Sequence, residues 1–313
     1  MAMLPVDLTD AADAVSAESP SGTRRRGDGR AATGFLAPSM LGLLAFTAFP
    51  IVASLILGFF DWPVIGDHTF TGLKNYQGLV ASPEFKTAIL NTVVFVLFYV
   101  PLNIVISLGL AVWISPKVRP RGLYRTIFFI PVVTPVVANA AIFSLILSPN
   151  GLIDSLMQSW FGVQAPNFLG SKTWAMPAVI LLSIWQGFGY NMLVFSAALD
   201  NVPTSLTEAA TIDGASAVAR FFKIRLPLIT PSIFFAVVLT LISSFQVFTQ
   251  AYVLTGGGPG NATTTMVLYL YEQGFQFFNL GVASAIAWVL FIIILIITIF
   301  QFIGQKRWVN YDQ

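Results

Sequence analysis

The stretch Asp200–Pro227, DNVPTSLTEAATIDGASAVARFFKIRLP, is a polar interruption between two long apolar runs. It concentrates charged side chains, whereas charged residues make up only 10% of the 313-residue chain. Because charged side chains are unstable in hydrocarbon, this stretch is predicted to be an aqueous connection between two membrane spans. Its charged residues are Asp200, Glu208, Asp213, Arg220, Lys223 and Arg225.

Local signals within this stretch predict two short helices. Ser205 and Glu208 have the spacing of a capping box, in which the first residue caps a helix and the second reaches back to the cap. Gly214 suits a left-handed turn that ends this helix. The residues from Ala215 to Arg225 predict a second short helix, which Pro227 is expected to stop.

The composition indicates a membrane protein. Hydrophobic residues make up 56% of the chain, and the mean hydropathy is +0.79. A soluble domain has about a quarter of its residues charged, and a core of this size could not absorb so much apolar surface. A net charge of +2 gives no reason to expect a nucleic-acid partner. Without cysteine and with only His68 for imidazole chemistry, no metal site is expected, and His68 is predicted to be a solvated loop residue.

The apolar runs predict an all-α, polytopic membrane helical bundle. A span must cross about 30 Å of hydrocarbon at about 1.5 Å per residue. Six runs are long enough, and the polar stretch around Glu208 lies between the fourth and the fifth. The six predicted spans are Gly34–Phe60, Thr87–Ile114, Leu123–Leu147, Trp174–Leu199, Pro227–Leu254 and Gly281–Ile303.

The distribution of basic residues predicts the orientation. With the N-terminus inside, only Lys74, Lys86 and Lys172 of the 16 Lys and Arg residues fall in outside segments. Basic residues favour the cytoplasmic side, so both termini and the Glu208 connection are predicted to be cytoplasmic. The basic cluster before Gly34 precedes an apolar run too long for a signal peptide, which predicts a retained first span.

Three short motifs in the polar stretch resemble a known family. Glu208-Ala209-Ala210, Asp213-Gly214-Ala215 and Leu226-Pro227 are similar to the EAA loop of bacterial ABC-importer permeases. The segment Tyr252–Thr265, YVLTGGGPGNATTT, resembles the carbohydrate-uptake branch, of the maltose and glycerol-phosphate type. The resemblance extends from about Pro38 to the C-terminus.

The resemblance implies a coupling role for the polar stretch. In this family the loop is a cytoplasmic coupling helix that docks into a groove of the ATPase subunit. The implied coupling residues are Glu208, Ala209, Ala210, Asp213, Gly214, Ala215, Leu226 and Pro227. The implied partners are a second homologous permease, two ATPase subunits and an extracytoplasmic solute-binding protein. No nucleotide-binding motif occurs in the chain, so it is expected to bind no cofactor and to catalyse no reaction, with ATP-Mg held by the partner ATPases.

The resemblance also implies a location and the organisation of the chain after its first residues, while the polar composition of residues 1–33 predicts a disordered tail. The location is the bacterial cytoplasmic (inner) membrane, with several passes. The expected parts are a disordered cytoplasmic tail over 1–33, a first transmembrane helix and external loop over 34–86, a five-helix MetI-like permease core over 87–304 with the coupling loop at 200–226, and a cytoplasmic tail over 305–313.

Uncharged polar side chains predict a solute pathway within the spans. Ser183, Gln186 and Tyr190 share one face of the fourth span, and Thr240, Ser243, Ser244 and Gln246 crowd the fifth. Hydroxyls and amides suit a neutral sugar-like solute, on which Trp185, Tyr190 and Phe245 could stack. The alternative is hydrogen bonding between helices. Counting from the Glu-Ala-Ala motif, the family's contact positions fall on Ser183, Gln186, Gly187, Tyr190, Thr240, Ser243, Ser244 and Val247, with Gln246 one residue away.

The glycine-rich run from Thr255 to Gly260 is not a phosphate loop, because it lacks the Lys-Ser/Thr ending and a preceding strand. It is predicted to be a flexible outer turn facing a binding protein.

These features together predict a permease subunit of an ATP-driven importer for a sugar or sugar-like solute. The main alternative is a stand-alone secondary carrier or channel for a neutral polar solute. The absence of charged residues from the central part of each span weighs against that alternative. A membrane-embedded enzyme acting on lipid-linked sugar would need clustered acidic or histidine residues, and the scattered Glu84, Asp154 and Glu272 do not provide them.

Overall fold

The computed structural model describes residues 28–114 and 120–310. Most of the predicted tail over 1–33 therefore lies outside the described residues, as do the last three residues of the predicted C-terminal tail. The chain divides into two units, Met1–Ala53 and Ser54–Gln313, and each is described by itself.

The described part of the first unit is helical. It begins with α2 (Asp28–Leu43), passes through the π-helical segment η1 (Leu44–Ala48) and continues into α3 (Phe49–Leu57), which reaches into the second unit. The apolar stretch Thr33–Leu57 is long enough to cross a membrane, and no residue of its most apolar part is buried within the protein. This stretch matches the first predicted span.

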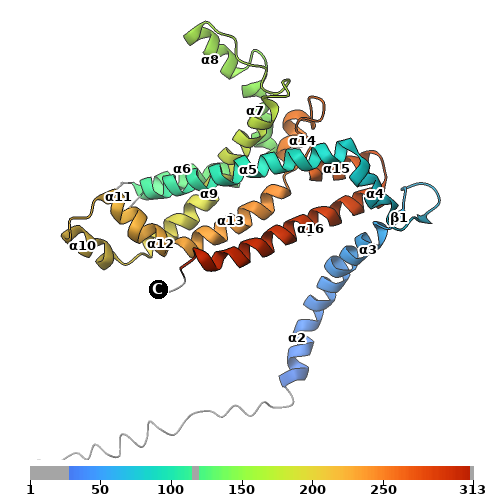
Figure 1. Ribbon diagram of the computed structural model, residues 1–313, viewed down its shortest axis with the longest axis horizontal. Coiled ribbons are helices and arrows are strands. Elements are labelled where there is room, and N and C mark those ends of the chain that lie inside the picture. The colour runs from blue at the N-terminus through green and yellow to red at the C-terminus, as the bar shows by residue number, and fades with distance from the viewer. Residues whose placement is uncertain (1–27, 115–119, 311–313) are drawn as a thin grey trace, which may run out of the picture. The chain divides into compact units, whose positions relative to one another are not determined.

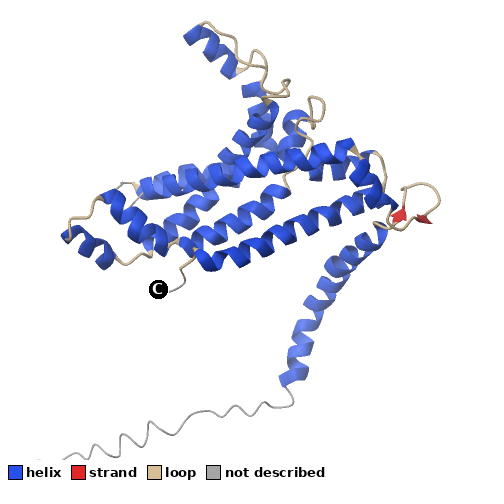
Figure 2. Ribbon diagram, in the orientation of Figure 1, coloured by secondary structure: helices blue, strands red, loops and turns tan. Residues whose placement is uncertain are grey.

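The second unit is a bundle of helices, and Figure 2 shows almost no strand in it. Its four long helices are α5 (Pro83–Trp113), α9 (Ala175–Asp200), α13 (Thr230–Phe245) and α16 (Leu280–Gly304). Helix α5 packs against α9 and α13, and α13 packs against α16 (Figure 1). The shorter elements are β1 (Phe60–Asp61), β2 (Thr69–Phe70), α4 (Lys74–Ala81), α6 (Arg121–Val133), α7 (Val136–Leu147), α8 (Leu152–Phe161), α10 (Thr204–Ile212), α11 (Ala217–Arg220), η2 (Phe221–Arg225), α12 (Leu226–Leu228), α14 (Thr249–Thr255), α15 (Met266–Tyr271), η3 (Glu272–Gln276) and η4 (Gln305–Arg307).

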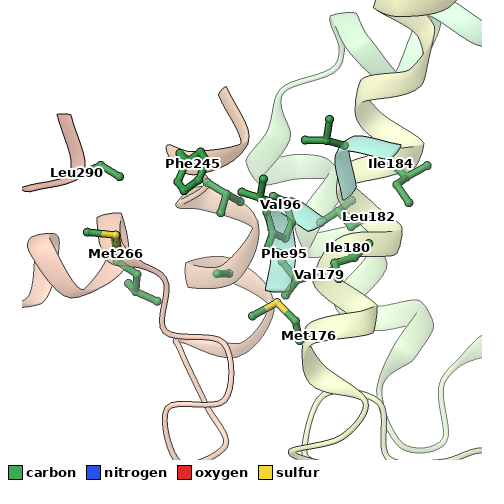
Figure 3. Close-up of a cluster of buried hydrophobic side chains, with 14 of the residues drawn as sticks. Phe95, Val96, Met176, Val179, Ile180, Leu182, Ile184, Phe245, Met266 and Leu290 are labelled. Atoms are coloured by element: carbon green, nitrogen blue, oxygen red, sulfur yellow. The ribbon is translucent and has the colours of Figure 1, made fainter. Parts of the chain in front are cut away.

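The core is centred on α5 and α9 and extends to α13, α14, α15 and α16. The buried positions of α5 recur every three or four residues from Phe85 to Ala111, so they lie on one face of the helix. Figure 3 shows Phe95 and Val96 of this face near Val179 and Leu182 of α9. The other face of α5 exposes large apolar side chains such as Leu97 and Val105, as expected for a helix that also faces lipid.

In the described chain, five helical stretches are long and apolar enough to cross a membrane, and one bent pair of helices gives a sixth when counted as a single span. The single stretches are Thr33–Leu57, Pro83–Trp113, Val136–Phe161, Ala175–Asp200 and Leu280–Arg307, and the bent pair is Ala217–Leu228 with Thr230–Phe245. The all-α membrane bundle predicted from the sequence is confirmed.

The third predicted span, Leu123–Leu147, is wrong as a single helix. Helix α6 ends at Val133, and α7 begins at Val136. Thr134 and Pro135 between them are both extended, with ψ of 135° and 130°. Proline disfavours the helical conformation of the residue before it, so Thr134 leaves the helix. In Figure 1, α7 turns away from the direction of α6.

The fifth predicted span, Pro227–Leu254, is also broken. Helix α13 begins only at Thr230 and ends at Phe245, and α14 begins at Thr249. The backbone N–H groups of Gln246 and Val247 close the end of α13 by donating to carbonyls three residues earlier, Ser243 O (3.1 Å) and Ser244 O (3.3 Å). No glycine or proline marks this break, so the sequence pattern gave no sign of it.

The inner connection, residues 201–228, comprises α10, α11, η2 and α12. The predicted capping box is wrong, because α10 begins at Thr204 directly after Pro203 and no side chain caps it. The left-handed turn at Gly214 is confirmed, with φ of +76°. Gly214 N bonds to Thr211 O (3.1 Å) and Ala215 N to Ala210 O (2.9 Å), which is the Schellman pattern.

The second predicted helix of this connection also differs in its limits. It begins after Ser216, whose side chain accepts a hydrogen bond from Ala219 N. It does not stop at Pro227, since that residue lies within α12. The preceding turn, η2, is π-helical, so its hydrogen bonds do not follow the regular α-helical pattern. The N–H that Pro227 lacks therefore falls where that pattern is already interrupted.

The outer loop, Thr255–Thr265, is ordered by its side chains, so the predicted flexible turn is wrong. Thr263, Thr264 and Thr265 are almost fully buried. The first two donate to Gly258 O (3.0 Å) and Gly257 O (3.2 Å), and the third donates to Val247 O (2.8 Å). Two of these bonds use the loop's own carbonyl groups and the third fastens the loop to the end of α13, which explains how a glycine-rich segment is ordered.

Candidate solute cavity and coupling surface

A cavity of about 310 Å³ lies where the two broken helices meet α5 and α9. Helix α7 begins at one break and α14 at the other, and α7 packs against both α14 and α9. Because α13 ends and α14 begins beside this cavity, polar residues from both sides of that break line it. The lining residues are Phe95, Tyr99, Val136, Ser183, Gln186, Ser243, Ser244, Gln246, Val247, Phe248, Thr249 and Gln250.

The polar groups of this lining are oriented mainly by their own backbone. Ser183, Ser243 and Ser244 donate their hydroxyl protons to carbonyls three or four residues earlier, at 2.7 to 3.0 Å. Their oxygen atoms keep lone pairs for another donor. Gln186 Nε2 donates across the α6–α7 break to Thr134 O (3.3 Å), and its buried Oε1 has no partner among the described residues. The cavity therefore offers acceptors at these residues, while Tyr99, Gln246, Thr249 and Gln250 add O–H and N–H donors, a combination suited to the hydroxyl groups of a neutral polar solute.

The structure brings together most of the residues that the sequence proposed for the pathway, but not all. The nine-residue set is divided by position: Ser183, Gln186, Ser243, Ser244, Gln246 and Val247 line the cavity, while Gly187, Tyr190 and Thr240 do not.

Gly187 lies against another helix. A side chain there would come within 2.5 Å of Tyr99 Oη and 3.0 Å of Asn103 Nδ2, so this glycine allows α5 and α9 to approach closely. Tyr190 is 46% exposed, away from the cavity. The glycine is a packing position here, and its effect on the cavity is indirect, through Tyr99.

The aromatic side chains that face the cavity are not the ones proposed from the sequence. Phe245 is buried in the core, and Trp185 packs against Phe143 with ring centroids 5.2 Å apart. The cavity is lined instead by Phe95, Tyr99 and Phe248. The sequence signal for Tyr99 was its place in an apolar span, four residues before Asn103, another polar residue.

Thr240 belongs to a buried polar cluster between three helices. Asn191 Nδ2 of α9 donates to Asn103 Oδ1 of α5 (2.7 Å) and to Thr240 Oγ1 of α13 (2.8 Å). Ser107 of α5 donates to Phe188 O of α9 (2.9 Å). The interhelical hydrogen bonding considered as the alternative for such residues is thus what Thr240 does.

The inner connection encloses a second cavity, of about 690 Å³, beside the end of α5. Glu208 of α10 lines it, as do Arg220 and Arg225 further along the connection. Glu208 is exposed, and no hydrogen bond or ion pair is found for its side chain within the described part of the chain. The neighbouring acid Asp200 is held by Arg121 and Arg125, the latter at 3.0 Å.

The other proposed coupling residues lie along the same connection. Ala209 and Asp213 are exposed near the end of α10, with Gly214 at the turn. Ala210 and Ala215 are partly buried and join the two sides of that turn. Leu226 and Pro227, also partly buried, form α12 at the far end of the connection.

The sequence reasoning missed an apolar surface on this connection. Ile212, Val218 and Phe222 are 87%, 67% and 58% exposed. Their apolar residue types, within a segment predicted to be aqueous, were the signal that could have identified them. Val218 and Phe222 are four residues apart on one helical run, and exposed apolar residues grouped on an otherwise polar segment are typical of a protein-binding surface.

Comparison with known proteins decides the family. The family model described as the inner membrane component of binding-protein-dependent transport systems matches residues 103–309. The chain belongs to this family. It is thus a transport component of the membrane, with several spans, and not a catalytic subunit.

Relatives of this transport component match it over most of its length. The probable ABC transporter permease protein YesP of Bacillus subtilis (strain 168) is 38% identical over 92% of this chain and 94% of its own. The arabinooligosaccharides transport system permease protein AraP of the same organism is 34% identical over 85% of both chains. A crystal structure of a bacterial ABC transporter involved in the import of the acidic polysaccharide alginate matches with a TM-score of 0.78 and 25% identity, over 88% of this chain and 95% of the other.

Proposed function

We propose that this chain is the permease subunit of an ATP-driven importer for a saccharide or saccharide-like solute. The observation that carries the proposal is the polar cavity at the junction of the two broken helices, in a chain of this family. In a mechanism of alternating access, this cavity opens first to one side of the membrane and then to the other.

The chemistry of the cavity supports a saccharide. Its lining combines serine, threonine and glutamine with three aromatic rings and contains no Asp, Glu, Lys or Arg among the described residues. A sugar presents hydroxyl groups at its edge and C–H groups on its face, so it matches both kinds of lining. The names of two similar proteins mention arabinooligosaccharides and alginate. The absence of basic residues from the lining disfavours a phosphorylated or strongly acidic solute, alginate included.

The inner connection supports a coupling role. Its exposed Ile212, Val218 and Phe222 provide apolar surface for a partner, and the exposed carboxylate of Glu208 is available for a basic group. A desolvated carboxylate requires such a partner, so an arginine or lysine of an ATPase groove is the expected contact. Glu208, Ala209, Ala210, Asp213, Gly214, Ala215, Leu226 and Pro227 are the residues proposed for this interface.

The proposal includes an assembly and an orientation. The chain pairs with a second homologous permease, two ATPase subunits that hold ATP-Mg, and an extracytoplasmic solute-binding protein. It lies in a bacterial cytoplasmic membrane with both termini and the inner connection in the cytoplasm. The distribution of basic residues supports this orientation.

The proposal is tested by uptake into proteoliposomes that contain the complex purified through a tag on this chain. Uptake of a labelled oligosaccharide is expected only with ATP inside the vesicles and the binding protein outside. A stand-alone carrier would instead transport without ATP, and co-purification of no ATPase would support it.

Matched variants locate the solute site within that assay. Gln186→Leu removes a polar group from the cavity, so a several-fold higher solute concentration should be needed for half-maximal uptake. Tyr190→Leu is the control, because Tyr190 has the same helical spacing but lies outside the cavity. Equal effects of the two variants would contradict the cavity as the solute site.

A further inference from the structure

The end of the chain contacts the joint between the inner connection and α13. Helix α12 ends at Leu228, and Ile229 (φ −95°, ψ 5°) leaves the helical conformation. Helix α13 then begins at Thr230, and the helical stretches on either side of Ile229 differ in direction by 67°. Ile229 is thus the single residue of backbone between α12 and α13.

The joint leaves one backbone acceptor without its helical donor. Pro227 O would pair with the N–H of the residue four positions later, but that residue is Pro231, which has no N–H. Thr230 Oγ1 donates to Pro227 O at 2.7 Å, and Asn310 Nδ2 approaches it at 3.5 Å. The backbone N–H of Ile229 also bonds to Pro227 O, so the two side chains add to this bond in place of the missing helical donor.

The hydroxyl group of Thr230 also receives a bond from the chain end. Asn310 N donates to Thr230 Oγ1 at 3.0 Å. Thr230 is largely buried, so the hydroxyl is satisfied as donor and as acceptor within the protein. One side chain therefore joins Pro227 before the bend to Asn310 at the end of the chain.

Apolar contacts hold the same terminal residues in place. Val309 is 9% exposed and packs in a small core cluster with Phe234 and Val238 of α13. The ring centroid of Trp308 lies 5.9 Å from that of Phe234. This cluster is separate from the main core. We name residues 305–310 the C-terminal strap. Figure 1 shows the C-terminal end of α16, which leads into this strap, near α12 and the start of α13.

We propose that the C-terminal strap fixes the angle of the joint, so that the inner connection and α13 move as one lever. Thr230, Val309 and Asn310 are then positioning residues for energy coupling. This inference rests on the proposed function, because the lever is useful only if the inner connection receives force from an ATPase. Without the strap, Ile229 would absorb the movement, and ATP hydrolysis would continue with less solute transported.

A matched pair of substitutions tests the hydrogen bonds. Thr230→Val keeps the shape of the side chain but removes both bonds, whereas Thr230→Ser keeps the hydroxyl. In proteoliposomes of the full complex, Thr230→Val is expected to lower the number of solute molecules imported per ATP hydrolysed several-fold, and Thr230→Ser is expected to restore it. A purely structural role would lower the yield of complex or its thermal stability and leave this ratio unchanged, which would overturn the proposal.

Truncation tests the strap as a whole. A chain ending at Arg307 loses Trp308, Val309 and Asn310 and should show the same fall in the ratio. A chain ending at Asn310 keeps these contacts and should match the full chain. Equal ratios for the two truncated chains would overturn the proposal.

A cross-link gives a readout that does not depend on transport. The chain has no native cysteine, so Val238→Cys and Val309→Cys introduce the only two thiols. A short bifunctional thiol reagent should join them rapidly in the membrane and leave the transport ratio intact. No cross-link would show that the strap is not docked, and a cross-link that blocks transport would show that the strap must release; either result overturns the proposal. If the unmodified complex shows no ATP-dependent uptake, the proposed function fails instead, and the cross-link still reports whether the strap is docked.

Discussion

The inner connection and the outer loop differ in what gives them their structure. Residues of the inner connection and of the C-terminal end of α5 together line the larger cavity. The outer loop bonds to the other end of α5, where Asn91 Nδ2 donates to Asn261 O (2.7 Å) and to Thr264 O (3.0 Å). Within α10 and α11 no residue is buried. In the outer loop, three consecutive threonines are buried and hydrogen-bonded.

This difference is what the proposed coupling role requires, because a partner-binding surface needs side chains that the fold itself does not use. The inner connection is shaped by the Gly214 turn and by a few local side-chain bonds such as the Ser216 cap, so most of its other side chains remain exposed. The outer loop uses its threonine side chains internally, where they supplement its backbone hydrogen bonds in satisfying buried carbonyl groups. Substitutions at the inner connection should therefore affect transport more than the free energy of unfolding. Substitutions at the outer loop should mainly affect the free energy of unfolding.

The largest effect is expected from Gly214→Val. Gly214 has φ of +76°, a conformation that costs a β-branched residue about 1–3 kcal/mol, so the Schellman turn should rearrange. Uptake in proteoliposomes should fall close to background while ATP hydrolysis persists. Gly162→Val is the matched control, since Gly162 has φ of +67° and, like Gly214, open space where a side chain would lie. The same loss of uptake in both variants would show that strain alone is responsible.

At the outer loop, Thr265→Val is expected to reduce the stability of the protein rather than its coupling to ATP hydrolysis. This change leaves Val247 O without the hydroxyl donor at 2.8 Å and removes the cap from Leu268 N. A buried unsatisfied polar group costs about 1–3 kcal/mol, so the midpoint of thermal unfolding in detergent should fall. Thr87→Val is the control, because the Thr87 hydroxyl is exposed and bonds only to Pro83 O. Unchanged unfolding for Thr265→Val would mean that the outer loop does not contribute to stability.

A smaller effect is expected from Ile212→Ser, which tests whether the exposed apolar surface binds the ATPase. Ile212 is 87% exposed, so its loss should leave the unfolding midpoint unchanged. Burial of such a side chain in an interface contributes about 1.5–3 kcal/mol, so less ATPase should co-purify with the tagged chain. Leu152→Ser, also exposed but at α8, should retain the ATPase. Normal ATPase recovery with Ile212→Ser would place the interface elsewhere.

The smallest effect concerns pH and Glu272, beside the outer loop. Burial raises the pKa of Glu272 above its ordinary value of 4.5. The folded state therefore binds this proton more tightly than the unfolded state. The stability from this group is complete below pH 4.5 and is lost as the pH rises through the raised pKa. Glu272→Gln should flatten this decline in the unfolding midpoint, and an unchanged pH profile would rule the group out.

The sequence predicted those features that depend on local composition. The length and apolarity of the runs predicted the bundle, and Gly214 predicted the turn that ends α10. Pro135 could have predicted the break after α6, because proline constrains the residue before it. The break after Phe245 could not be predicted, since Gln246–Phe248 carries no local signal. There, tertiary contacts decide, with Val247 O bonded to Thr265 from the outer loop.

The cavity was only partly predictable for the same reason. Helical spacing identified Ser183 and Gln186 on one face, but it could not show that Tyr190 lies outside and that Phe248 faces inward. Those positions depend on where the helices break. The misjudged flexibility of the outer loop arose because glycine content was weighed without the three threonines that follow it.

The close approach at Gly187 has a consequence for how such a protein can change its substrate in evolution. Tyr99 Oη occupies the space that a side chain at position 187 would need, and the same tyrosine lines the solute cavity. Even a single methyl group at position 187 would force the phenol group of Tyr99 to move, and so would alter the wall of the cavity. The shape of the cavity can therefore be changed from a position that does not line it.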